Sequence, residues 1–340
     1  MARASALGLV APGLDAQPDV PSILRMSEPL RRIQVDAAAW FRDQLAHSPR
    51  ARAYLAERGI TRATADAWGL GYAPAHDGLL RHLAARGWSA TLLLASGLAL
   101  DAPLRPRWVD RLMLPLPDEA GVPLAFAGRA LEADVEPKYL SSPTSALFVK
   151  HRELYGWPNL PAVRAAGEAL LVEGHLDMLA AWQAGHRHVL ALGGTLLHPE
   201  QLARLGVPRL TLVLDGDAAG VRGLERALTA PATADLRVGV VTLPAGEDPA
   251  SLLQRDPGAF EAALAAPRSR WRYLWDTTRA RYVERAARDV EARIAWKDAW
   301  VALCRAAPAD LWPRLLAPLA RELGGMPLGL LLEDCARGPR

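Results

Sequence analysis

Helical periodicity dominates the first part of the chain. From Val35 onward, apolar residues recur every three or four positions, which predicts an amphipathic helix. Thr61 and Ser89 each precede another such segment and are expected to be N-caps, because a hydroxyl there can accept a hydrogen bond from the first turn. The apolar runs 112–116 and 122–127 flank the turn sequence PDEAG and predict a β-hairpin.

The pattern changes between residues 168 and 243, where apolar runs of strand length alternate with segments of helix length. This alternation predicts a parallel sheet with helices on both faces, and such sheets place their sites beyond the carboxyl ends of the strands. After residue 268 the pattern is helical again. We therefore expect a mixed α/β fold. Its parts are a flexible leader over 1–34, a helical and β subdomain over 35–165, a parallel-sheet domain over 166–265 and a helical bundle over 266–335.

Composition narrows the class of protein only a little. The chain has 340 residues and a formal charge of +3, so it is long enough for several cores, and its net charge does not identify a nucleic-acid binder. Cys304 and Cys335 lie far apart without a nearby histidine, so we expect buried thiols and no zinc. No apolar run approaches the ~18 residues of a membrane span, and we expect a cytoplasmic protein without a membrane partner.

Acidic residues follow three of the expected strands. Glu173 follows the run ALLV, Asp215 and Asp217 follow TLVL, and Asp248 comes shortly after VGVVTL. Two carboxylates ~4 Å apart repel by about 4 kcal/mol at an effective dielectric of 20, and a divalent cation removes this conflict. An all-oxygen ligand set favours Mg²⁺ or Mn²⁺. A lone DGD tripeptide is also common as a turn or a helix N-cap, so the prediction depends on all three strands.

Cationic and aromatic residues alternate upstream of this sheet. Two of the three lysines, Lys138 and Lys150, lie in one short segment with Tyr139, Phe148 and Tyr155. Phosphates need positive charge and unstacked bases need flat partners, so the segment is suited to a single-stranded nucleic acid. An ordinary solvated loop with buried tyrosines is the alternative.

Longer strings resemble a known family. LLVEGHLDMLAAWQAG followed by LVLDGDAAGVRGLERAL resembles the TOPRIM domain of bacterial DnaG-type primases, and PKYLSSP and FVKHRELYG resemble the primase-specific segment before it. The resemblance covers about residues 36 to 265. It implies a metal-binding set of Glu173, Asp215, Asp217 and Asp248, of which the first three are also catalytic. It implies that Arg111, Arg129, Lys138, Lys150 and Asp177 bind nucleic acid or nucleotide.

The implied activity is magnesium-dependent synthesis of RNA primers from ribonucleoside triphosphates on a single-stranded DNA template. Ala250 stands where the family usually has a second acid, and His175 where an aromatic residue is common. No segment resembles the family's zinc-binding or helicase-binding domain, so a separate zinc-binding domain and a replicative helicase are candidate partners. Two rival hypotheses remain, a TOPRIM-type nuclease and a non-catalytic single-stranded DNA-binding protein derived from a primase.

Overall fold

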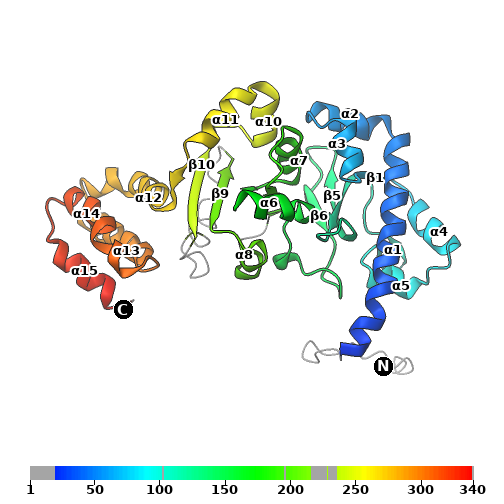
Figure 1. Ribbon diagram of the computed structural model, residues 1–340, viewed down its shortest axis with the longest axis horizontal. Helices are drawn as coiled ribbons and strands as arrows, with labels where there is room; N and C mark the ends of the chain where they lie inside the picture. The colour runs from blue at the N-terminus through cyan, green and yellow to red at the C-terminus, as the bar shows by residue number, and fades with distance from the viewer. Residues whose placement is uncertain (1–19, 102, 195–196, 216–227, 229–235, 339–340) are drawn as a thin grey trace, which may run out of the picture.

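The computed structural model describes residues 20–101, 103–194, 197–215, 228 and 236–338, and the side chains from residue 27 onward. Helices and a small antiparallel sheet from the first half of the chain lie at one end of the molecule (Figure 1). A second, five-stranded sheet lies in the middle, and helices from the last quarter of the chain form the other end.

Residues 20–101 and 103–141 form five helices and a four-stranded antiparallel sheet with strand order β1-β4-β5-β6. The helices are α1 (Val20–His47), α2 (Pro49–Glu57), α3 (Arg62–Ala67), α4 (Gly78–Ala85) and α5 (Ala90–Ala95). The strands of this sheet are β1 (Gly71–Ala73), β4 (Arg111–Pro117), β5 (Pro123–Ala130) and β6 (Tyr139–Ser141), beside a short pair of β2 (Ala99–Leu100) and β3 (Arg105–Pro106). Thr61 and Ser89 accept hydrogen bonds from Thr64 N and Leu92 N, which confirms both as N-caps.

The leader predicted for residues 1–34 needs a correction, because α1 begins at Val20. Leu30, Ile33, Ala37 and Phe41 recur at helical spacing and are all buried, so one face of the helix packs into the core from Leu30 onward. The helix also contains Pro29, which removes one backbone hydrogen bond without ending it. Residues 20–34 are therefore helical, and residues 1–19 lie outside the described part of the chain.

The predicted hairpin is confirmed as β4 and β5, which pair from Arg111 with Ala130 to Pro117 with Pro123. Neighbouring side chains of a strand point to opposite faces, and here both faces are buried. Leu112 and Leu114 pack into a core shared with the second sheet, whereas Met113 packs with α1 residues such as Phe41. The first sheet is thus held directly against the domain that follows it.

The predicted parallel sheet is confirmed, with strand order β11-β10-β9-β7-β8. Its strands are β7 (Glu168–Val172), β8 (Val189–Ala191), β9 (Arg209–Leu214), β10 (Arg237–Thr242) and the short antiparallel β11 (Arg268–Ser269). The helices of this part are α6 (Leu160–Ala166), α7 (His175–Gln183), α8 (Pro199–Leu205), α10 (Pro249–Arg255) and α11 (Pro257–Ala265), with 3-10 turns η1 (Lys150–Arg152) and η2 (Trp157–Asn159) before them. The helix expected near residues 219–228 lies almost entirely outside the described residues.

The last part of the chain is helical, as predicted. It comprises α12 (Arg270–Ala286), α13 (Val290–Cys304), η4 (Ala309–Leu311), α14 (Trp312–Glu322) and α15 (Leu328–Ala336). Trp275, Trp296 and Trp300 belong to the same core as Leu171 and Leu212 of the parallel sheet, so the bundle continues the packing of that sheet. Cys304 and Cys335 are buried free thiols. Among the described residues, no helix combines the length and apolar character needed to cross a membrane.

Candidate active site

Two acidic residues meet at the carboxyl edge of the parallel sheet. Glu173 directly follows β7 and Asp215 directly follows β9, and these two strands are parallel neighbours. The backbone N–H of Asp215 donates a 3.1 Å hydrogen bond to Glu173 Oε1. The expected convergence of strand ends therefore holds for this pair. Asp217 lies outside the described residues.

Asp177 is buried in the first turn of α7, immediately behind this edge. Its Oδ1 accepts a 3.3 Å hydrogen bond from the backbone N–H of Ala250, in the first turn of α10. Burial and the nearby carboxylates of Asp248 and Glu173 raise the pKa of Asp177 to about 6, although the Ala250 N–H and Arg129 act in the opposite direction. Asp248 and Glu173 thus both act electrostatically on Asp177.

Asp248 also has a structural task, because it caps α10. Its Oδ1 accepts a 2.7 Å hydrogen bond from Ser251 N, and its own backbone N–H donates to the Ser251 hydroxyl at 3.0 Å. The Ser251 hydroxyl also donates to Glu247 at 2.6 Å, and Glu247 is paired with Arg255 at 2.9 Å. Ala250, where the family usually carries an acid, instead contributes its backbone N–H to Asp177. No pattern in the sequence indicated this contact.

Arg129 and four rings from different elements form a cluster, whose member His175 lies two residues before Asp177. The guanidinium of Arg129 lies 5.0 Å from the ring centre of Tyr139 and is hydrogen-bonded to the hydroxyl of Tyr54. Tyr139 stacks on His175 with ring centres 5.2 Å apart, and Tyr155 lies 4.9 Å away on a tilt. Burial, Lys150 and Arg129 lower the pKa of His175 to about 4, so this imidazole is neutral near pH 7. Tyr54 and His175 had no assigned role in the sequence analysis.

The basic residues expected to bind nucleic acid fall into two groups. Lys138 and Lys150 are exposed, and Lys150 lines a small cavity of about 20 Å³ together with Tyr155, His175 and Gly193. Arg111, by contrast, is buried, and its Nη1 donates to the carbonyls of Gly128 and Pro137 at 3.1 and 2.9 Å. These contacts hold the Arg111 side chain within the first sheet. Arg129 is equally buried, so contact of either guanidinium with nucleic acid stays a prediction.

The donor chemistry of the acidic edge fits a hard divalent cation. Glu173, Asp177, Asp215 and Asp248 offer carboxylate oxygens. The raised pKa of Asp177 reflects burial first and then the negative charge of Asp248 and Glu173, which a cation would relieve. In the described part of the chain, no three Asp, Glu, His or Cys side chains come close enough to form a metal site by themselves. Asp217, the remaining carboxylate of the expected metal-binding set, lies outside that part of the chain.

Comparisons with known proteins agree with this arrangement. Residues 40–160 match the family described as DNA primase catalytic core, N-terminal domain, and residues 170–253 match the Toprim-like family. The DNA primase of Deinococcus radiodurans is 36% identical over 251 residues, which cover 71% of this chain. A DNA primase domain from Pseudomonas aeruginosa has a solved structure with a TM-score of 0.76 and 31% identity, covering 90% of this chain and 100% of that one. The chain belongs to the DnaG-type DNA primases.

A second solved structure and the lengths of the related primases show which part of a primase this chain resembles. A DnaG primase catalytic domain bound to single-stranded DNA has a TM-score of 0.75 and 25% identity, over 90% of this chain and 99% of that domain. These two primase structures confirm the mixed α/β fold that the sequence predicted. The chain spans about two fifths of the length of the curated primases it matches, 43% for D. radiodurans and 38% for P. aeruginosa.

Proposed function

We propose that this chain catalyses nucleotidyl transfer in the synthesis of RNA primers on a single-stranded DNA template. The observation that carries this proposal is the contact between its two domains beside the acidic residues. The guanidinium of Arg129 lies 5.0 Å from the ring centre of Tyr139 in the first sheet, and that ring stacks on His175 of α7, two residues before Asp177. Both domains therefore contribute residues to one site. In this proposal residues 35–165 and 166–265 form the two domains that meet there, and residues 266–335 form the bundle.

Primases with a Toprim domain are in general metal-dependent. Here Glu173, Asp215, Asp217 and Asp248 would hold Mg²⁺ or Mn²⁺, which when bound supplies positive charge to the triphosphate and to the phosphate being transferred. The contact between Asp215 N–H and Glu173 supports this set, because it orients the Glu173 carboxylate. Asp177 accepts the Ala250 N–H and holds the first turns of α7 and α10 together.

Lys138, Lys150 and Arg129 are proposed to bind the phosphates of template, primer or incoming ribonucleotide. Exposed cations suit the phosphates of a single strand, and a related DnaG domain was solved bound to single-stranded DNA. The rings of Phe148 and Tyr155 are buried, so they are not available to stack on bases. The buried guanidinium of Arg129 is oriented by Tyr54 and Tyr139 before any ligand arrives. A replicative helicase and a zinc-binding domain supplied separately remain proposed protein partners.

One experiment separates this proposal from its rivals. The protein is incubated with a labelled DNA template, the four ribonucleoside triphosphates and Mg²⁺ or Mn²⁺, with and without an annealed RNA primer. We expect RNA products from the wild-type chain and none from Asp215→Asn, which preserves the size and backbone of residue 215. Shortening of the labelled strand would identify a nuclease instead. Binding of the strand without any new product would identify a non-catalytic DNA-binding protein.

A further inference from the structure

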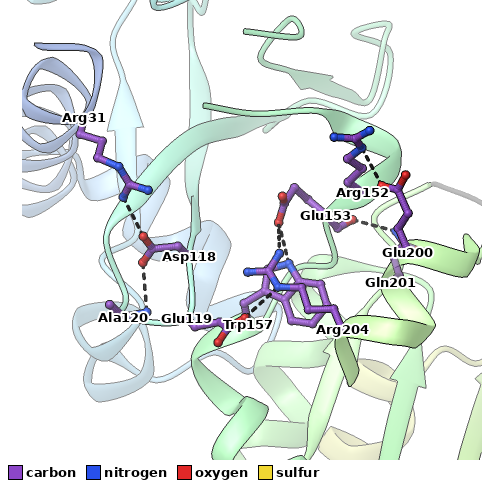
Figure 2. A network of polar contacts seen from close by, with 10 residues as sticks. All are labelled: Arg31, Asp118, Glu119, Ala120, Arg152, Glu153, Trp157, Glu200, Gln201 and Arg204. Carbon is purple, nitrogen blue, oxygen red and sulfur yellow. Dashed lines mark hydrogen bonds and ion pairs between the residues drawn. The ribbon is translucent and has the colours of Figure 1, made fainter. Parts of the chain in front are cut away.

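Arg204 of α8 joins the two domains through several contacts of one side chain (Figure 2). Its Nε lies 2.8 Å from Glu119, at the tip of the hairpin between β4 and β5. Its Nη1 lies 3.0 Å from Glu153, which follows η1. The guanidinium also stacks on Trp157, 3.8 Å from the ring centre. Flat stacking and two carboxylate partners fix both the position and the plane of this group.

Glu153 is the most constrained partner in this network. Its Oε2 accepts hydrogen bonds from Trp157 Nε1 at 2.6 Å and from Arg204 Nη1 at 3.0 Å. Its backbone carbonyl accepts another from Gln201 Nε2 at 3.1 Å. Trp157 and Gln201 are fully buried, and the Glu153 side chain is only 18% exposed. Helix α8 therefore holds both the side chain and the backbone of Glu153.

The neighbouring ion pairs are weaker by comparison. Arg152 and Glu200 lie 2.6 Å apart, but their side chains are 55% and 48% exposed, so water screens this pair. The Glu119 side chain is 46% exposed. We expect the partly buried contact between Arg204 and Glu153 to determine the position of residues 150–153.

This segment carries Lys150. The chain from Lys150 to Glu153 is short, and Tyr155, two residues later, pairs with Ala191 through backbone hydrogen bonds of 2.9 and 2.7 Å. Lys150 is exposed and lines a cavity of about 20 Å³ together with His175 and Gly193. Lys150 thus stands just before two anchors, one on α8 and one on β8.

From these contacts we propose that Arg204 is a positioning residue, which holds Lys150 at the site through Glu153 and fixes the β4–β5 hairpin through Glu119. The inference rests on the proposed role of Lys150 in binding phosphate. Arg204 itself is directed at Glu119, Glu153 and Trp157, so its effect on nucleic acid passes through the segment that it holds. Loss of Arg204 should therefore remove the same phosphate contact that loss of Lys150 removes.

A double-mutant cycle on the whole chain tests this inference. Affinity for a fluorescein-labelled oligothymidylate is measured against salt concentration for wild type, Lys150→Ala, Arg204→Lys and the double variant. One lost phosphate contact reduces the slope of log affinity against log salt by about 0.7, which is about fivefold in affinity at ~0.1 M salt. Arg204→Lys keeps the charge but loses the planar fork that reaches two carboxylates. We expect Arg204→Lys to reduce the magnitude of the slope towards the value of Lys150→Ala. The double variant should show no further reduction.

Arg209→Lys is the matched control, because Arg209 starts β9 at the opposite end from Asp215 and pairs with Glu168 at 3.5 Å. It should leave the slope unchanged. Thermal unfolding of every variant separates a loss of stability from a loss of contact, because a merely structural Arg204 would lower the melting temperature and leave the slope intact. If Arg204→Lys does not fold, Glu153→Gln tests the same contact, because it keeps the size of the side chain and removes the charge that pairs with Arg204.

Two results would overturn the inference while leaving primer synthesis as the proposed function. One is a wild-type slope in Arg204→Lys beside a reduced slope in Lys150→Ala. The other is a double variant whose losses add, since each residue would then act separately on the nucleic acid. An unchanged slope in Lys150→Ala would remove both the inference and the role of Lys150, whereas the synthesis assay reports on the proposed function independently.

Discussion

The carboxylate of Asp177 occupies the space that a side chain at Gly174 would need. A Cβ placed on Gly174 would stand 2.1 Å from Asp177 Oδ2, closer than real Cβ contacts allow. Gly174 is the N-cap of α7 and Asp177 lies in its first turn, so the carboxylate folds back over the start of its own helix. The glycine of the EGHLD string is therefore required by a neighbouring side chain, because the φ of −102° at Gly174 is open to any residue.

Gly174→Ala should displace Asp177 and break its hydrogen bond to Ala250 N–H. Because that bond connects the first turns of α7 and α10, we expect primer synthesis to fall at least tenfold while the far-ultraviolet circular dichroism stays unchanged. Gly258→Ala is the control, since a Cβ there would meet Asp256 Oδ1 at an ordinary 3.4 Å. Full synthesis by Gly174→Ala would show that the position of Asp177 does not matter for the reaction.

Asp248 allows the charge of the acidic edge to be separated from the capping of α10. Asparagine caps helices about as well as aspartate, so Asp248→Asn keeps the helix start but removes one negative charge near Asp177. Without metal we expect Asp248→Asn to be as stable as the wild type or slightly more stable. With millimolar Mg²⁺ the wild type should gain melting temperature, because a cation that binds the folded state stabilises it, and the variant should gain less.

Asp256→Asn is the matched control for this measurement. Asp256 also caps a helix, α11, by accepting a 3.0 Å hydrogen bond from Ala259 N, but Asp256 is not part of the acidic edge. The rise in melting temperature that Mg²⁺ causes in Asp256→Asn should equal the rise in the wild type. Equal gains in all three proteins would exclude Asp248 from the metal site.

The three lysines of the chain give a direct test of the basic segment. Lys138→Ala should reduce the salt slope of single-strand affinity by about 0.7 by removing one phosphate contact. Lys297→Ala should leave that slope as it is, because Lys297 lies in the bundle and pairs with Asp334 at 2.6 Å. If Lys138→Ala and Lys297→Ala change the salt slope equally, Lys138 acts through the net charge of the protein and not through a contact at its own position.

Much of the fold could be predicted because it depends on local chemistry. The hydroxyls of Thr61 and Ser89 cap the helices that follow them, and continuous apolar runs such as TLVL form strands buried on both faces. Glu173 and Asp215 could be located from the strands that they follow, since parallel neighbours end at one edge.

Long-range contacts account for what the sequence analysis missed. The helical period of residues 20–34 is interrupted by Pro29, and Ile33 belongs to a core that also contains Met113 and Phe126 of the first sheet. A sequence assigns charge to Arg111 but does not show that two carbonyls surround its guanidinium. In the same way, Ala250 contacts Asp177 through its backbone N–H, which every residue except proline has. The residue type at position 250 therefore could not predict this contact.

The stability of the hairpin tip should depend on pH through Asp118. Its Oδ2 pairs with Arg31 of α1 at 2.8 Å, while its Oδ1 accepts the backbone N–H groups of Ala120 and Val122, both at 3.0 Å. Burial alone would raise the pKa of Asp118, but the hydrogen bonds from Arg31 and Val122 and the charge of Arg31 hold it below its ordinary value of 3.8. A carboxyl whose pKa is depressed on folding contributes stability above the unfolded pKa and loses it as the pH falls through the folded pKa.

Asp118→Asn separates the charge from the turn, because an amide oxygen can still accept both backbone N–H groups. We expect the variant to unfold more easily than the wild type at pH 7, by no more than about 1 kcal/mol because Arg31 is partly exposed. The difference should narrow as the pH falls below about 4, where the wild-type carboxyl becomes protonated. Urea unfolding at a series of pH values measures it. Arg31→Gln should follow the same pH course and add little to Asp118→Asn in the double variant, whereas a difference that stays constant down to pH 3 would mean that the charge of Asp118 does not stabilise the tip.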